Sequence, residues 1–187
     1  GGSHILVGSG LLNGGSTASI SITNCFSTTY SAYRMIIRRF IPIQNDDDMR
    51  IRIINTSGSD VDASNYRWVV QRQRSDGDDR YQNQADSKFK AIGGGIYNSD
   101  QQGGANVDMM IHTDRNTTGG NTFNAHWRAG VARDNNSASY HTGYAHYNDT
   151  TGDVAPSGIK IFAGASNISQ IRVAIYGIVG ANLNNGW

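Results

Sequence analysis

Met49-Arg50-Ile51-Arg52-Ile53 is the stretch of this 187-residue sequence that most directly indicates its fold. Apolar side chains alternate with arginines, and a period of two is the repeat of a β-strand that buries one face. The segment from Ser16 to Ile22 alternates in the same way, with Ala18, Ile20 and Ile22 on one face. Both segments are therefore predicted to be strands that pack one face against a core.

Further strands are predicted because the same alternation recurs between clusters of Asn, Asp, Gly and Ser. They cover residues 33–41, 66–71, 89–97, 107–113, 123–133, 139–147, 158–163 and 171–179. About nine or ten strands without intervening helices favour an all-β, antiparallel, jelly-roll-like β-sandwich over a sheet of βαβ units.

Three local expectations follow from the same pattern. The strand at 33–41 is apolar on both faces, through Ile36 and Phe40 among others, and is predicted to be central and covered on both sides. The strand at 49–53 follows an acidic turn and is predicted to form a hairpin with the strand before it. Residues 75–87 are polar and Asp-rich, which predicts a surface loop.

The length suits one domain, which we expect to consist of an N-terminal extension or tether at 1–15, a sandwich at 16–180 and a tail at 181–187. A formal net charge of +1 argues against a nucleic-acid partner. No apolar run approaches the ~20 residues that span a bilayer, so we expect no membrane insertion. The single Cys25 excludes an internal disulfide and is predicted to be a small buried hydrophobe.

Catalytic signatures are weak, and we expect a non-enzymatic protein without a cofactor. The Gly-x-Ser-x-Gly pattern of a nucleophile elbow does not occur. Glycoside hydrolysis needs two facing carboxylates, yet Glu does not occur and most Asp residues lie in turn-like runs where Asp favours local hydrogen bonds.

Metal binding has one weak candidate, a Ca²⁺ site at Asp46, Asp47 and Asp48. Clustered carboxylates suit Ca²⁺, but the spacing and the central Gly of an EF-hand loop are missing. His141 and His146 lie five positions apart and would point to opposite faces of one continuous strand, so the histidines are not expected to form a metal site.

The densest aromatic stretch runs from Ser139 to Asn148 and supplies the candidate residues for glycan or receptor binding. Rings with polar edges suit both sugar stacking and partner contact. The alternative is that these side chains pack inside the sandwich or against a sister subunit. The candidates are Tyr140, His141, Tyr144, His146 and Tyr147.

The N-terminal part resembles virion proteins of tailed phages. The resemblance rests on a strand that ends in Phe26-Ser27-Thr28-Thr29-Tyr30, a long strand with Tyr33, and an acidic turn before the Arg-alternating strand at 49–53. The segments 158–163 and 171–178, which end in Tyr176-Gly177-Ile178, are similar to that family's terminal pair of strands. The resemblance covers residues 16–74 and 157–179; it departs at Asn45-Asp46-Asp47-Asp48, where a turn Gly is expected.

The resemblance implies a jelly-roll-like domain at the surface of a virion, in a tail fibre, a capsid fibre or a decoration protein. It also implies a homotrimer, contacts with other virion proteins and receptor choice in the variable middle, but it carries no catalytic residue across. The main hypothesis is therefore a structural or host-adhesion module of the extracellular particle. The alternatives are a free-standing glycan-binding lectin and a polysaccharide depolymerase.

Overall fold

The computed structural model describes residues 3–74, 76–99, 104–114, 122–134, 137–149 and 154–179, which form a β-sandwich of two antiparallel sheets. The larger sheet has eight strands, in the spatial order β1 (His4–Thr17), β12 (Ile168–Ile178), β3 (Ala32–Pro42), β8 (Ala105–Asp114), β9 (Thr122–Asp134), β10 (Ser137–Tyr147), β5 (Tyr66–Arg74) and β6 (Gly77–Asp86). The smaller sheet has four, in the order β2 (Ser19–Ile22), β11 (Pro156–Ala163), β4 (Asp47–Asn55) and β7 (Phe89–Ile96). The prediction of an antiparallel β-sandwich is confirmed.

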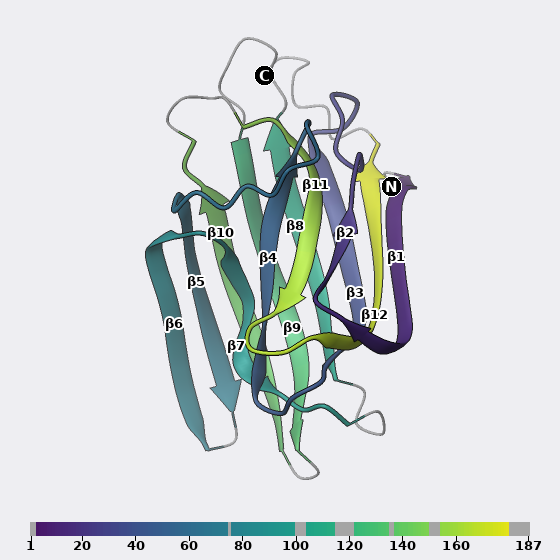
Figure 1. The fold of residues 1–187 in the computed structure, drawn as a ribbon. Helices are drawn as coiled ribbons and strands as arrows, with labels where there is room; N and C mark the ends of the chain where they lie inside the picture. Colours follow the sequence, from purple (N-terminus) through teal and green to yellow (C-terminus); the bar gives the residue numbers. More distant parts are fainter. Residues whose placement is uncertain are drawn as a thin grey trace.

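The smaller sheet covers one face of the larger sheet (Figure 1). The hairpin of β5 and β6 extends past it, at the left of the view. The other face of the larger sheet, here called the outer face, has no strand of the smaller sheet upon it.

The core lies between the sheets, where the inward-facing half of each alternating strand is buried. Ile51 and Ile53 of β4 face this core, as do Met35 of β3 and Trp127 of β9. The Trp127 indole donates a hydrogen bond to the Ala91 carbonyl of the opposite sheet over 2.8 Å. Polar groups of buried rings therefore find partners across the sandwich, as buried donors require.

Cys25 lies in this core, as predicted for a small buried hydrophobe. Burial raises the pKa of its thiol to about 12, so the side chain stays neutral.

Strand β3 is central, between β12 and β8, but only one of its faces is covered, contrary to the prediction. Ile36 is half-buried on the outer face, whereas Phe40 lies fully in the core. A bulge explains the difference: the pairing shifts between Ile37 and Phe40, and Arg39 has a φ of 60°. The extra residue reverses the alternation, so Ile37 and Phe40 share one face.

Three further expectations are corrected by the strand order. Residues 4–17 form the edge strand β1 and not a tether, and residues 77–86 form the edge strand β6 and not a loop. The acidic turn connects β3 and β4 across the two sheets, so these strands are not a hairpin. The tail at 181–187 lies outside the described residues.

Candidate functional site

Strand β10 carries the candidate binding residues and separates them onto its two faces. It pairs without interruption from Ser139 to Tyr147 with β5, so successive side chains alternate between the outer face and the core. Tyr140 and Tyr144 are 42% and 44% exposed, and His146 is half-buried on the same side. His141 and Tyr147 are buried on the core side. The structure therefore brings together three of the five candidates.

His141 is corrected from a surface candidate to a core residue. Its Nε2 lies 2.9 Å from the Ser139 hydroxyl, and its Nδ1 has no hydrogen-bond partner in the described part of the chain. Burial, assisted by the charges of Arg72 and Arg133, lowers its pKa to about 4. A serine and a histidine are thus in contact, but among the described residues the imidazole lacks the carboxylate that orients the histidine in a Ser-His-Asp triad.

Tyr147 is likewise corrected, because its ring belongs to the aromatic core. The Tyr66 and Tyr147 rings meet edge to face at a centroid distance of 4.8 Å. Its hydroxyl accepts a hydrogen bond from the Asn65 amide over 3.4 Å. Gly143, also on the core side, leaves room for Trp127: a Cβ there would lie 2.2 Å from the indole.

Tyr140 borders a hollow of about 690 Å³ on the outer face, here called the outer hollow. Strands from β1 across to β10 contribute its lining, so the pocket depends on the register of the whole sheet. The lining residues are His4, Arg34, Asp108, Met110, His126, Trp127, Arg128, Tyr140, Thr142 and Ile178.

An ion pair lies in the outer hollow. The Arg34 guanidinium donates two hydrogen bonds to the Asp108 carboxylate, over 2.9 and 2.8 Å. This pairing, with the nearby charges of Arg128 and Arg38, lowers the pKa of Asp108. The pair carries no signal in the sequence, because β3 and β8 become neighbours only in the folded sheet.

Aromatic groups continue from the outer hollow toward one end of the outer face. The Tyr144 hydroxyl donates a hydrogen bond to Asn124 Oδ1 over 2.8 Å, which holds the exposed ring across the β9–β10 pair. His112 and His126 stack with centroids 5.9 Å apart. Burial, together with the neighbouring His126, lowers the pKa of His112. His146 has a lowered pKa as well, because of burial and the charge of Arg67.

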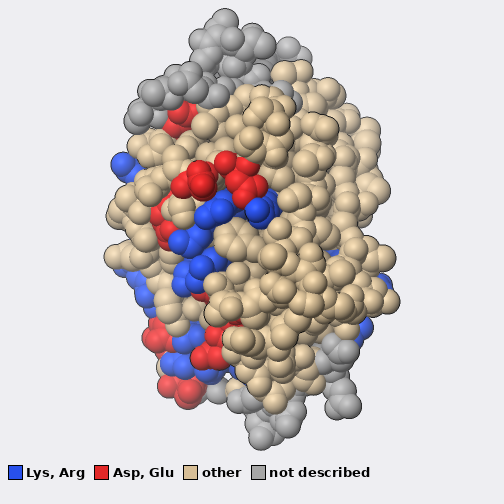
Figure 2. All heavy atoms as spheres, in the orientation of Figure 1, with Lys and Arg blue, Asp and Glu red and all other residues tan. Residues whose placement is uncertain are grey.

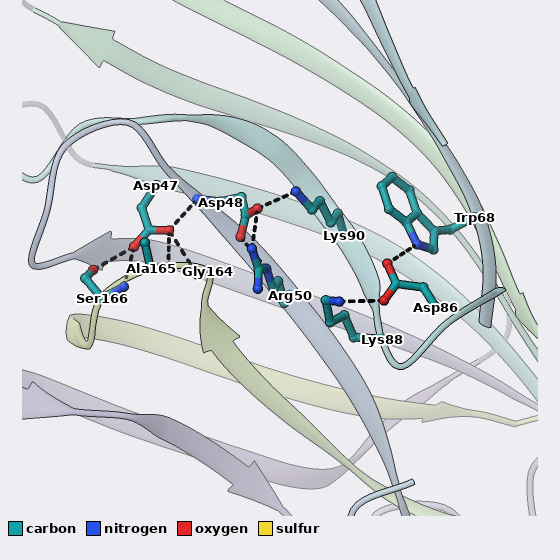
Figure 3. A network of polar contacts seen from close by, with 10 residues as sticks. All are labelled: Asp47, Asp48, Arg50, Trp68, Asp86, Lys88, Lys90, Gly164, Ala165 and Ser166. Atoms are coloured by element: carbon teal, nitrogen blue, oxygen red, sulfur yellow. Dashed lines mark hydrogen bonds and ion pairs between the residues drawn. The ribbon is translucent and has the colours of Figure 1, made fainter. Parts of the chain in front are cut away.

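The acidic run that forms the weak Ca²⁺ candidate is divided among different partners (Figure 3). Asp47 accepts hydrogen bonds from the backbone amides of Gly164, Ala165 and Ser166, over 2.9 to 3.0 Å. Asp48 instead pairs with Arg50 and Lys90, over 2.7 and 2.6 Å. Asp46 is exposed with a φ of 61°. The three carboxylates therefore do not converge on one point.

Within the described ranges, no group of three or more His, Cys, Asp or Glu side chains is arranged to hold a metal ion. The same part of the chain has no helix of the length and apolarity needed to cross a membrane. The outer face therefore combines exposed tyrosine rings with an ion pair of fixed geometry.

No family model matches this chain, and a search of curated proteins found no match. Its function must therefore be inferred from the geometry of the outer face and from the sequence resemblance.

Proposed function

We propose that this chain is a non-enzymatic surface module of a tailed-phage virion that attaches to a host-surface glycan through its outer hollow. The observation that carries the proposal is the exposure of Tyr140 beside the Arg34–Asp108 pair, with the Tyr144 ring exposed further along the same face of β10. Tyrosines on a water-exposed face with neighbouring polar groups match a ligand that has apolar ring faces and hydroxyl edges.

The rigidity of this surface supports recognition. Tyr140 and Tyr144 belong to a strand that is paired on both sides, and Asn124 fixes the Tyr144 hydroxyl. A ring that is already ordered loses little conformational entropy when a sugar stacks on it. The ion pair adds hydrogen-bonding groups in a fixed geometry next to the rings.

The location on a virion is supported by the resemblance of both ends of the sequence to tailed-phage proteins. A jelly-roll-like connectivity is part of the proposal, and consecutive strands that alternate between the sheets, from β2 to β5 and from β11 to β12, support it. A tail fibre, a capsid fibre and a decoration protein all agree with these observations.

Assembly into a homotrimer, with contacts to other virion proteins, is also part of the proposal. Edge strand β1 supports self-association, because Leu6 and Leu11 are 56% and 65% exposed and the strand carries no Asp, Glu, Lys or Arg. Exposed apolar edge strands pair readily with other chains. Light scattering after size-exclusion chromatography tests this; a monomer at micromolar concentration contradicts the trimer and favours the free-standing lectin.

The binding proposal is tested by measuring attachment of Tyr140→Ala and Tyr144→Ala proteins to an array of bacterial surface polysaccharides. Loss of one stacking ring is expected to weaken attachment about 5- to 30-fold, equivalent to 1 to 2 kcal/mol, with an unchanged midpoint of unfolding. Ser9→Ala is the control, because Ser9 is exposed on edge strand β1 and does not line the outer hollow.

Two other outcomes decide against the proposal. If the tyrosine variants lose stability or assembly together with attachment, the rings are packing elements. If the wild-type protein releases reducing ends from a polysaccharide that it binds, the depolymerase alternative is correct.

A further inference from the structure

The uneven width of the two sheets creates a second hollow, on the side of the larger sheet that faces the smaller one. Strands β5 and β6 extend past the smaller sheet (Figure 1). An open groove of about 550 Å³ lies where residues of β5 and β6 meet residues of β4 and β7. We call it the overhang groove. Its lining residues are Arg50, Trp68, Arg80, Tyr81, Gln82, Asn83, Asp86, Lys88 and Lys90.

Charged side chains are concentrated around this groove. Figure 2 shows basic and acidic groups in one band on the side of β4, β5 and β7, whereas the surface over β2 is nearly free of charge. The cations Arg50, Lys88 and Lys90 and the carboxylate Asp86 line the groove; Arg80 borders it too, but it pairs with Gln71, so its side chain lies on the outer face of the sheet. With Asp48 behind Arg50 and Lys90, the three cations of the groove still exceed the carboxylates by one.

The two carboxylates are fully engaged by protein donors (Figure 3). Asp86 accepts hydrogen bonds from Trp68 Nε1 over 3.3 Å and from the Ser87 amide over 2.8 Å, and it also pairs with Lys88. Burial raises the pKa of Asp86, but the hydrogen bond and charge of Lys88, together with Trp68 and Ser87, outweigh it and lower the pKa overall. Asp86 therefore stays ionised at neutral pH.

The cations, in contrast, retain unused donors. An ammonium group has three N–H donors, and Lys88 and Lys90 each make one ion pair among the described residues. An incoming anion can bind these donors without displacing Asp48 or Asp86.

The groove also has an ordered aromatic wall and a polar rim. The Tyr81 ring occupies the space beside Gly93, where a Cβ would lie 2.5 Å from it, and the Arg72 guanidinium lies 5.2 Å from its centroid. Asn83 is exposed at the rim, on the same side of the sheet as Tyr81. An aromatic wall, a side-chain amide and ammonium groups together suit the ring face, the hydroxyls and the carboxylate of an acidic sugar.

We propose that the overhang groove binds an acidic saccharide, with a uronic-acid carboxylate between Lys88 and Lys90. A nucleic acid fits less well, because three cations in one pocket do not form a track along a phosphate backbone and the net charge of the chain is only +1. The groove does not overlap the outer hollow, so the inference is independent of the function proposed above.

The test is calorimetric titration of the folded protein with an oligogalacturonate of about four residues and with neutral maltotetraose. The acidic probe is expected to bind, with an affinity that falls roughly tenfold or more when NaCl rises from about 20 to about 200 mM. The neutral probe is expected to bind at least about tenfold more weakly than the acidic one. The Lys88→Gln, Lys90→Gln double variant should lose about tenfold or more in affinity. Arg80→Gln removes a nearby cation whose side chain lies on the opposite face of the sheet, so it should leave the affinity unchanged.

Two control variants distinguish binding in the overhang groove from a general effect of charge and from binding at the outer hollow. Lys160→Gln removes one positive charge that is paired with Asp60 outside the groove, and Tyr144→Ala alters the outer face; neither should change the affinity for oligogalacturonate. The inference is overturned if the wild-type protein does not bind the acidic probe, if Lys160→Gln weakens binding as much as the double variant, or if a single-stranded oligonucleotide binds more tightly.

Discussion

Asp47, at the start of β4, and Asp108, in the middle of β8, show how the same side chain serves two different purposes. Asp47 is 4% exposed, and its carboxylate holds the segment from Gly164 to Ser166, between β11 and β12, through backbone amides. The Asp108 side chain is 31% exposed, and its carboxylate meets one arginine in an open hollow.

The difference lies in what replaces water around each carboxylate. At Asp47, protein donors take the place of water around the carboxylate. Most of them are backbone amides of a segment more than a hundred positions away, so this charge stabilises the fold and is not accessible to a ligand. At Asp108 much of the hydration remains and the nearby Arg128 and Arg38 make no ion pair with any described residue, so the charge is still accessible to a ligand. Stability and recognition are thus predicted to separate between these two sites.

Asp47→Ala is expected to have the largest effect on stability. It removes the acceptor for four backbone amides, those of Asp48, Gly164, Ala165 and Ser166, and for the Ser166 hydroxyl. A buried donor left without a partner costs about 1 to 3 kcal/mol, but only the Asp48 amide is buried and water can reach the others, so the free energy of unfolding should fall by about 2 to 4 kcal/mol. Urea denaturation at pH 7 measures this.

The neighbouring Asp46 provides the control. It is exposed and has a φ of 61°, which Asn tolerates well, so Asp46→Asn should change stability by less than about 0.5 kcal/mol. Equal effects of the two substitutions would show that the acidic run acts only through its overall charge.

The fold was largely predictable from the sequence because most strands bury one face and therefore alternate. The two strands that were missed, β1 and β6, are the edges of the larger sheet, where side chains on both faces are often exposed. Alternation is weak at such positions, since neither face must be apolar. The bulge at Arg39 was also missed, because it depends on how β3 pairs with β8 and not on β3 alone.

The candidate site was predictable only in part. Alternation correctly placed His141 and His146 on opposite faces of β10, but the sequence does not state which face meets the core. Arg34 and Asp108 are 74 positions apart, and Lys90 is distant in sequence from its partner Asp48. These contacts depend on the strand order, which no local pattern encodes.

His141, like Asp47, is a titratable residue that is buried in the fold. Its folded-state pKa is about 4, whereas an unfolded histidine has an ordinary value near 6.5. The unfolded chain therefore binds more protons between these values, so the free energy of unfolding should be constant above about pH 6.5 and should fall, by roughly 3 kcal/mol at most, as the pH drops to about 4.

This pH dependence is measured by urea denaturation at about pH 7, 5.5 and 4.5. His141→Gln should remove the largest part of the slope and leave a smaller part from His112 and His146, whose pKa values are also lowered. Ser139→Ala should retain the slope, because that variant loses the hydrogen-bond partner but keeps the buried imidazole. A slope that persists unchanged in His141→Gln would assign the pH dependence to other groups.

The smallest effect on stability is expected for the Arg34–Asp108 pair. A small contribution to the free energy of unfolding would distinguish this pair in the outer hollow from the buried Asp47. A double-mutant cycle with Arg34→Gln and Asp108→Asn should give a coupling energy of about 0.2 to 1 kcal/mol, because both side chains remain partly hydrated. The hydrogen bond from Arg34 lowers the pKa of Asp108, so this coupling is present at neutral pH and is lost as the carboxylate becomes protonated in acid. Raising NaCl from about 0.1 to about 1 M should reduce it further, since screening acts strongly on exposed charges. A coupling energy above about 2 kcal/mol that does not change with salt would show that the fold requires Asp108, as it requires Asp47. The ion pair would then no longer be regarded as available to a ligand.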